Sequence, residues 1–275
     1  MSVGAPLRVA IVSNGNAFST VMLRPLFDEP GISVVGAVLV RQPPGEGGRL
    51  GRLIRLARRT GWRYAWHKLG SLTVPALVGV IDRTPVFLDQ LCERRGVAHR
   101  TLDTVNGRDG VATLREWDPD VLVSVSSPER FDPEVLGVAS VASINLHWAL
   151  LPRYAGIAPY FWVLRHGERE TGLTIHLMVP ELDAGDVLRR RILGIGPTDT
   201  SLGLQMRLTS AGADELAAAV LELPGSIATA TPQDRDGRSY FTWMRPADVQ
   251  ALRRNGRRLA RWSDYARMRA MLTGR

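Results

Sequence analysis

Cysteine is almost absent from this sequence. Cys92 is the only one in 275 residues, which excludes an internal disulfide framework and a four-cysteine metal site. A lone cysteine fits a reducing compartment, so we expect a cytoplasmic protein without a secretory leader before the first apolar run at residues 7–13. The longest apolar stretch, residues 72–81, is about half of the roughly 20 residues that cross a bilayer. The sequence therefore predicts no membrane span.

Acidic residues are in the minority. Lys and Arg number 35 against 27 Asp and Glu, which gives a net charge of +8 and a pI near 10.6. The excess is consistent with an anionic partner such as a polyglutamylated folate, a phosphorylated substrate, RNA or an acidic membrane surface. It is equally consistent with an arginine-rich, solvated surface encoded by a GC-rich genome. The remaining composition, 45% apolar and 23% charged, is typical of a globular protein with a full core.

The glycine signature of dinucleotide-binding proteins is also missing. The first apolar run turns through residues 13–16 with a single glycine, and the glycine-rich stretch at residues 45–51 lacks a glycine at the third motif position. We read this stretch as a flexible entry to the next helix. NAD binding is therefore not expected.

What the sequence does contain is a regular alternation of strand and helix patterns. Short β-branched runs at residues 9–13 and 34–40 lie on either side of a helical pattern at 18–27. Together they predict a βαβ unit with a right-handed crossover. The alternation continues with helices at 85–95 and 111–117 and with strands at 97–102, 121–125 and 141–146. The pattern predicts an α/β fold with a doubly wound, mostly parallel sheet, in which ligands bind at the carboxyl ends of the strands.

The last part of the chain indicates where the catalytic domain ends. Strand patterns at 175–178 and 187–192 precede a helix at about 200–223, which Pro224 and Gly225 are expected to end. We therefore predict a catalytic domain over residues 1–223, with a helical insertion at about 45–82. Residues 224–275 are predicted to form a linker and a small C-terminal extension that is too short to be an independent domain.

The insertion contains an arginine-rich amphipathic segment at residues 49–69. Its apolar residues share one helical face, and its arginines lie largely elsewhere. A surface helix docked by its apolar face is one interpretation, and a dimer contact, a substrate lid or a basic membrane-surface helix are the others. The predicted apolar face comprises Leu50, Leu53, Ile54, Ala57, Gly61, Ala65 and Trp66.

Residues 144–186 form the chemically most informative block. A strand carries Asn145 and His147 onto the same side, because strand side chains alternate with a period of two. The chain then turns at Pro152. A second strand ends at Val179, and Asp183 lies in the loop after it. If the two strands are neighbours, the Asp183 carboxylate can reach the imidazole.

Asn, His and Asp without a serine or cysteine nucleophile suit direct acyl transfer to an amine. Asn145 can donate to the developing oxyanion, an effect of about 2.7–4 kcal/mol per donor. His147 can share that contact or relay the amine proton, which contributes roughly 10²- to 10⁴-fold. Asp183 can orient the imidazole and pass the proton on through water. Taken singly, each residue also has a structural interpretation, as a satisfied strand histidine or a turn-forming aspartate.

The order of motifs in this block resembles the family of formyltransferases that use 10-formyltetrahydrofolate. Six elements of the family pattern occur in the family's order. They are Asn145 with His147, Ala149 to Pro152, Gly156, Pro159, Thr171 with Gly172, and Leu182 to Gly185. One departure is Ala149, where the family usually has serine.

The resemblance implies a Rossmann-like formyltransferase fold, 10-formyltetrahydrofolate as formyl donor, no metal, and catalytic roles for Asn145, His147 and Asp183. It also places the folate pterin between the loop at residues 127–131 and the loop at 179–183, and the amine near Asn14 and Asn16. The implied cofactor-binding residues are Ser127, Pro128, Glu129, Arg130, Phe131, Leu150, Leu151, Pro152, Val179, Pro180, Glu181 and Leu182.

The acceptor amine is constrained mainly by what the chain lacks. Only about 45 residues follow the linker, whereas the family member that acts on initiator tRNA carries a full additional domain, so we do not expect a nucleic-acid substrate. The phosphate-binding loop of the glycinamide ribonucleotide enzymes is not well reproduced, and those enzymes lack the insertion. We therefore expect a small-molecule amine, either an amino sugar or a natural-product amine. The aromatic residues at 240–243 favour a sugar.

Three alternatives remain open at this point. A formyltetrahydrofolate hydrolase would use the same three residues with water as acceptor. A basic nucleic-acid-binding protein on an inactive scaffold would explain the arginine clusters at residues 49–63 and 253–261. A membrane-associated formyltransferase would act on a lipid-linked amino sugar. A homodimer is also compatible with the sequence.

Overall fold

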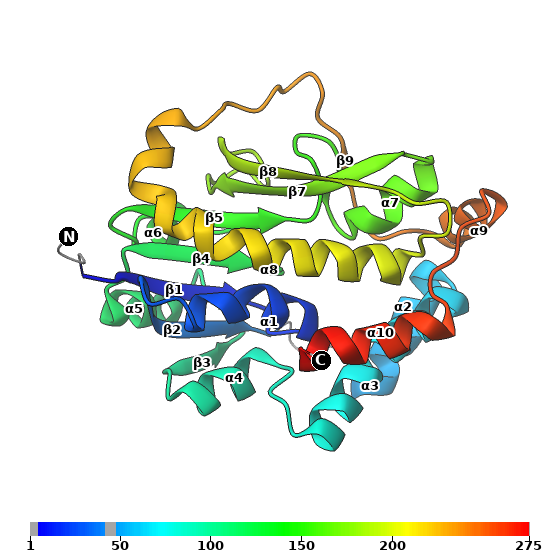
Figure 1. Ribbon diagram of the computed structural model, residues 1–275, viewed down its shortest axis with the longest axis horizontal. Coiled ribbons are helices and arrows are strands. Elements are labelled where there is room, and N and C mark those ends of the chain that lie inside the picture. The colour runs from blue at the N-terminus through cyan, green and yellow to red at the C-terminus, as the bar shows by residue number, and fades with distance from the viewer. Residues whose placement is uncertain (1–4, 42–47, 275) are drawn as a thin grey trace.

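A seven-stranded sheet forms the centre of the computed structural model, which describes residues 5–41 and 48–274 (Figure 1). The strand order is β3-β2-β1-β4-β5-β7-β8. The first five of these strands are parallel, and β7 and β8 are antiparallel to their neighbours. The predicted doubly wound, mostly parallel α/β fold is therefore confirmed. The strands are β1 (Leu7–Ser13), β2 (Ile32–Val40), β3 (His99–Leu102), β4 (Val121–Val125), β5 (Ala142–His147), β7 (Glu170–Leu177) and β8 (Val187–Gly194).

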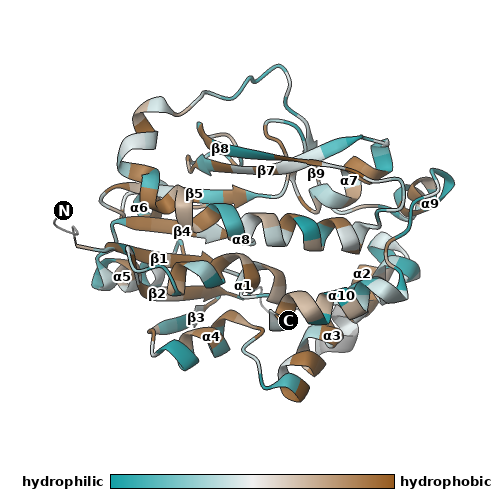
Figure 2. Cartoon of the chain, in the orientation of Figure 1, coloured by the Kyte–Doolittle hydropathy of each residue, from teal (hydrophilic) through white to brown (hydrophobic). Residues whose placement is uncertain are grey.

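Two apolar cores lie on the two faces of this sheet. In β1, Ile11 belongs to one core and Val12 to the other, because successive side chains point to opposite faces. The helices α1 (Ala17–Leu23), α4 (Leu88–Arg95) and α8 (Ser201–Ser226) cover the first face, whereas α5 (Arg108–Trp117) and α6 (Pro133–Leu136) cover the second. Burial on both faces explains why β1, β2 and β4 read as nearly continuous apolar runs, and Figure 2 shows these three strands largely in the hydrophobic colours.

A glycine in β2 allows α5 to approach the sheet closely. A Cβ atom at Gly36 would lie 2.3 Å from the Trp117 ring, so no larger residue fits there without a shift. Near this point the pairing of β1 with β2 slips by one residue, between Val9 and Ala10. The close approach thus coincides with a bulge, a feature that alternation of apolar residues does not reveal.

The helix before the linker is longer than its sequence predicts. Pro224 and Gly225 were expected to end it at residue 223, but α8 continues to Ser226 with Pro224 in its last turn. A proline removes only its own N–H from the helical ladder, and the N–H of Ile227 still donates to the Leu223 carbonyl. The short 3₁₀ helix η2 (Ile227–Thr229) then follows.

The insertion consists of two helices where one was predicted over residues 49–69. They are α2 (Gly48–Thr60) and α3 (Trp62–Asp82), separated at Gly61 with a φ of 86°. The break shifts the helical phase, so Trp66, predicted on the buried face, is 65% exposed while Ala57 and Ala65 are buried. The predictions at residues 45–47 and for the side chains of Arg49, Leu50 and Arg52 lie outside the described part of the chain.

The C-terminal extension packs against the first 223 residues at several points. Its strand β9 (Tyr240–Phe241) pairs with β6 (Ala155–Gly156), and α9 (Pro246–Arg254) and α10 (Trp262–Thr273) contact α7 (Pro159–His166) and α3 respectively. The Thr200 hydroxyl, which caps α8, donates to the buried Asp264 carboxylate at 2.7 Å. Figure 1 shows α2, α3, α9 and α10 gathered at one end of the molecule. Within the described residues, no helix combines the length and apolar character of a membrane span.

Candidate active site

The carboxyl end of β5 brings the predicted catalytic side chains to the edge of the sheet. Asn145 and His147 lie two residues apart on this strand, and β5 pairs with β7 in antiparallel register, Asn145 opposite His176 and His147 opposite Thr174. This pairing fulfils the condition that the sequence left open, that the strands on either side of the block are neighbours. His147, His176 and Asp183 are all less than 10% exposed.

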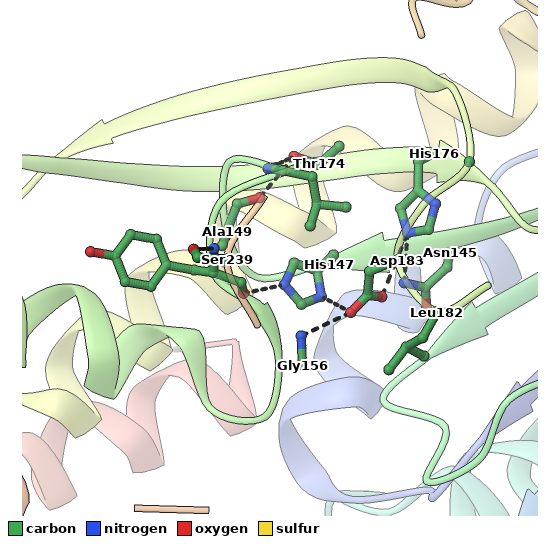
Figure 3. A network of polar contacts seen from close by, with 12 residues as sticks. Asn145, His147, Ala149, Gly156, Thr174, His176, Leu182, Asp183 and Ser239 are labelled. Atoms are coloured by element: carbon green, nitrogen blue, oxygen red, sulfur yellow. Dashed lines mark hydrogen bonds and ion pairs between the residues drawn. The ribbon is translucent and has the colours of Figure 1, made fainter. Parts of the chain in front are cut away.

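Asp183 faces both imidazoles from the loop after β7 (Figure 3). Its Oδ2 atom lies 3.6 Å from His147 Nδ1 and accepts a hydrogen bond from the Gly156 N–H at 2.9 Å. Its Oδ1 atom lies 3.9 Å from His176 Nε2. The backbone of Asp183 has a φ of 52°, a left-handed conformation that turns the carboxylate back over the strand ends. The structure thus brings the three predicted residues into one buried network.

The hydrogen bonds of His147 determine which ring nitrogen is free. Its Nε2 lies 2.9 Å from the Tyr154 carbonyl oxygen, which can only accept, so Nε2 carries a proton. In the neutral ring Nδ1 is then an acceptor and faces the Asp183 carboxylate across 3.6 Å. A proton or a bridging water between the two acceptors satisfies both. His147 is therefore arranged to accept a proton at Nδ1 while Asp183 stabilises the charge that results.

His176 is a member of the network that the sequence analysis did not identify. Its Nδ1–H donates to the Leu177 carbonyl at 2.8 Å, so Nε2 accepts from the Asn145 amide at 3.1 Å. Burial lowers the pKa of His176 to about 4, although Asp183 opposes the shift. The neutral ring fixes the Asn145 amide with its nitrogen toward His176, which leaves the second N–H as a donor. The alternating Thr174 and His176 on the strand before Asp183 are the sequence signal that could have revealed this residue.

The linker and β6 support the Asp183 loop. Gln233 Nε2 donates to the backbone carbonyls of Asp183 and Gly185 at 3.1 and 2.7 Å. Arg238 donates to the Leu182 carbonyl at 2.7 Å and forms an ion pair with Glu181. These contacts span about 50 residues of sequence, so no local pattern predicts them.

The predicted folate loop at residues 127–131 is held partly by structural contacts. The Glu129 carboxylate accepts from the Val105 N–H at 2.6 Å and from the Thr104 hydroxyl at 2.7 Å, and Phe131 is buried in the second core. Ser127 differs, because its hydroxyl is buried and has no hydrogen-bond partner within the described residues. A bound group could use this hydroxyl. The cofactor role of residues 127–131 stays a prediction.

The other predicted folate contacts lie on two segments. Leu151 is buried, and its N–H donates to the Thr174 hydroxyl at 3.0 Å, which in turn donates to the Ala149 carbonyl at 2.7 Å. The peptide between Leu151 and Pro152 is cis, and Leu150 and Leu182 are half-buried. A hollow of about 390 Å³ lies at the second segment; it is lined by Leu177, Val179, Pro180, Glu181, Ala184, Gly185, Asp186 and Arg235, and thus not by Asn145 or His147.

The two predicted substrate residues have different surroundings. Asn16 caps α1, because its Oδ1 accepts from the N–H groups of Phe18 and Ser19 at 2.9 and 3.0 Å. Asn14 is exposed, and its Oδ1 accepts from Asn16 Nδ2 at 2.7 Å. Asn16 thus has a structural role of its own, and substrate contact by either residue stays a prediction. Within the described residues, no three His, Cys, Asp or Glu side chains are grouped to hold a metal ion.

The part of the chain that holds this site matches a known protein family. Residues 89–220, which carry Asn145, His147, His176 and Asp183, match the family model described as formyl transferase. Over these residues the chain is similar in sequence to formyl transferases. Solved formyltransferase structures share the fold over these residues and extend the likeness to both sides of them.

Three of these structures illustrate the breadth of the likeness. A glycinamide ribonucleotide transformylase from Symbiobacterium toebii is 14% identical, with a TM-score of 0.58, 84% of this chain covered and 96% of that one. A sugar N-formyltransferase from Shewanella sp. FDAARGOS_354 is 19% identical, with a TM-score of 0.52 and coverage of 89% and 79%. An N-formyltransferase from Helicobacter canadensis, solved with folinic acid and dTDP-3-aminofucose, is 14% identical, with a TM-score of 0.51 and coverage of 86% and 71%. At these identities the likeness shows that the chain shares the fold of each of them.

Proposed function

We propose that this protein is an N-formyltransferase that moves the formyl group of 10-formyltetrahydrofolate to the amine of a small molecule, an amino sugar or a natural-product amine. The observation that carries the proposal is the buried network in which Asn145, His147 and Asp183 meet at the carboxyl end of β5. The sugar N-formyltransferases among the similar structures support an amino-sugar acceptor, and the one solved with folinic acid supports a folate donor. The single buried cysteine remains the reason to expect a cytoplasmic enzyme.

The residues around the network suit the two substrates. The partnerless Ser127 hydroxyl and the 179–182 segment would hold the folate on one side of Asn145. The exposed Asn14 lies at the carboxyl end of β1, where it would meet the amine. Because β1, β4 and β5 are adjacent parallel strands, their carboxyl ends meet at one edge of the sheet, so both substrates can converge on the same site.

The proposed reaction is a direct acyl transfer. The amine nitrogen attacks the formyl carbon, a new C–N bond forms, and the carbonyl electrons move onto oxygen. The free N–H of Asn145 donates to that oxyanion, and His176 keeps the amide in the donating orientation. His147 Nδ1 takes the amine proton, directly or through water, while Asp183 stabilises the imidazolium. The proton then passes to the folate nitrogen as its bond to the formyl carbon breaks.

Turnover of 10-formyltetrahydrofolate in the presence of candidate amines tests this proposal. The purified protein would be mixed with the donor and with a panel of amino sugars, nucleotide-linked amino sugars and hydroxylated diamines, and tetrahydrofolate formation would be followed. We expect amine-dependent turnover that His147→Ala lowers by roughly 10²- to 10⁴-fold. His99→Ala, the same change on β3 outside the network, is the matched control and should retain activity. Turnover that needs no amine would instead indicate a hydrolase, and no turnover with any amine would contradict the proposal.

A further inference from the structure

The outer face of α3 exposes a row of large apolar side chains. Trp62, Trp66, Leu77 and Val80 are between 58% and 78% exposed and lie on one side of the helix at helical spacing. Leu72 and Ile81 flank the row, and both are more than half exposed. From Trp62 to Val80 the row extends over about 27 Å at 1.5 Å per residue. Exposed apolar side chains that gather on one helix face indicate an interaction surface more strongly than ones scattered singly.

The inner face of α3 shows that the helix is firmly attached. Tyr64 and Ala65 are at most 2% exposed, and the Tyr64 ring contacts Phe161 of α7 and Trp243 of the C-terminal extension. The helix therefore has two apolar faces, one packed against the protein and one turned outward. Figure 2 shows hydrophobic turns toward the C-terminal end of α3, which lies next to α10. Trp262, the first residue of α10, adds a third exposed tryptophan with 91% exposure.

Positive charge is concentrated in the segments that form this end of the molecule. Residues 48–83 and 245–275 together contain 17 basic and three acidic side chains, whereas the rest of the chain contains 18 basic and 24 acidic ones. These two segments form the helical end that Figure 1 shows. Arg58, Arg59, Arg63 and Arg258 are exposed and form no ion pair within the described part of the chain. The helical segments that carry the apolar row thus also carry exposed guanidinium groups that form no ion pair within the described residues.

We infer that α3 and the start of α10 dock on the surface of an anionic lipid bilayer. Tryptophans suit the interfacial region, where one part of the indole is apolar and the N–H is wet. Aliphatic side chains between them enter the acyl boundary, and arginines at the border bind lipid phosphates. The match of charge selects this occupant over a second copy of the chain, because a symmetric dimer through this face would bring two strongly basic surfaces together. The inference does not depend on the proposed function.

The insertion that contains α3 lies at the same edge of the sheet as the candidate active site. The insertion follows the carboxyl end of β2, and His147 lies at the carboxyl end of β5, so both are at the same edge of the parallel sheet. An aromatic series connects them, since Tyr64 contacts Phe161 while the neighbouring Tyr160 packs on Trp148, the residue after His147. Docking through α3 would therefore hold the candidate active site beside the membrane.

Vesicle co-sedimentation of the full-length protein tests the inference. Phosphatidylcholine vesicles with and without phosphatidylglycerol would be compared, and tryptophan fluorescence would be recorded in parallel. We expect sedimentation and a blue shift with the phosphatidylglycerol vesicles, and weaker binding as salt rises. The combined substitution Trp62→Ser, Trp66→Ser and Val80→Ser should lower the partition coefficient roughly tenfold or more, because binding scales with the apolar area inserted. Ile192→Ser, an exposed apolar residue on β8, is the matched control.

A second variant separates charge from apolar contact. Arg59→Gln, Arg63→Gln and Arg258→Gln should weaken binding to phosphatidylglycerol vesicles by roughly tenfold or more. Arg108→Gln, on α5 at the opposite side of the sheet, should leave it unchanged. No binding to either vesicle, or equal binding by the tryptophan variant and the native protein, would overturn the inference. It would also be overturned if sedimentation velocity showed a dimer that the tryptophan variant dissociates while vesicles recruit nothing.

Discussion

The central sheet and the outer face of α3 use the same kinds of residue in opposite ways. In β4 and β5, valine, isoleucine and leucine are at most 2% exposed and lie between covering helices. On α3, leucine, valine and tryptophan of similar hydrophobicity are more than half exposed. The first group contributes to folding because folding removes it from water. The second group gains much less from folding, so most of its apolar surface is available for a partner.

The polar side chains of the candidate active site depart from the usual pattern in the opposite way, because they are buried. His147, His176 and Asp183 are buried and Asn145 is half-buried, although burial is costly for such groups. Each has at least one hydrogen-bond or ion-pair partner, and the network is held by backbone groups of Tyr154, Gly156 and Leu177. Both departures from the rule of apolar inside and polar outside therefore mark regions where function, and not folding, explains the residues.

The largest expected effect is the loss of stability when a leucine of the central sheet is shortened. Leu146 of β5 is 2% exposed, so Leu146→Ala should lower the free energy of unfolding by about 2–5 kcal/mol, through lost burial and the cavity left behind. Leu77→Ala, the same change on the outer face of α3, should cost less than about 1 kcal/mol. Urea denaturation followed by circular dichroism measures both. Equal losses would show that the α3 face is packed in the folded protein.

Most of the fold could be predicted from the sequence because it follows from local patterns. Buried β-branched runs and the turn residues between them indicated every strand of the central sheet, and the order of motifs located Asn145, His147 and Asp183. Boundaries were less accurate where one residue changes the geometry. Gly61 breaks the insertion into two helices, whereas Pro224, expected to end α8, lies within it.

Part of the site could not be predicted because it depends on contacts between distant segments. His176 joins the network only because β5 and β7 pair in the register that puts it opposite Asn145. Gln233 reaches Asp183 from a linker that carries no motif. The pairing of β6 with β9 was also missed, since strands of two residues leave no pattern to detect. Tertiary packing determines these features.

A smaller effect is predicted for the pH dependence of stability. Burial lowers the pKa of His176 to about 4, while the unfolded chain has the ordinary value near 6.5, so below pH 6.5 only the unfolded state takes up the proton. Stability should be full above this pH and fall as the pH drops toward 4, by about 2 kcal/mol at pH 5 from this residue. Thermal unfolding between pH 7 and pH 5 measures it.

His176→Asn is the variant that sharpens this result. It should reduce the loss of stability between pH 7 and pH 5 and leave a remainder, because burial also lowers the pKa of His67 to about 4. His67 belongs to α3, so the two histidines report on the sheet and the insertion respectively. An unchanged pH dependence in His176→Asn would mean that burial does not keep the His176 ring neutral in the folded protein.

Because Gln233 of the linker supports the Asp183 loop, its replacement should lower stability by a smaller amount. Gln233→Leu removes two hydrogen bonds to the Asp183 and Gly185 carbonyls and should lower the free energy of unfolding by about 1–2 kcal/mol. Under the proposed function, kcat should fall as well, because the loop that presents the carboxylate is released. Gln250→Leu, on the exposed side of α9, is the matched control and should change neither quantity. Loss of stability with full activity would show that the loop stays in place without Gln233.

The smallest expected effect gives the strictest test of the comparison. Trp62→Ser with Trp66→Ser removes two of the largest side chains in the protein, yet the free energy of unfolding in vesicle-free buffer should change by less than about 0.5 kcal/mol. Both rings are more than half exposed, and serine and tryptophan have similar helix propensity, so little is lost in the folded state. Urea denaturation at two protein concentrations measures this change. A loss of several kcal/mol that grows with protein concentration would mean that these rings are buried between copies of the chain, and the outer face of α3 would then serve assembly instead of a membrane surface.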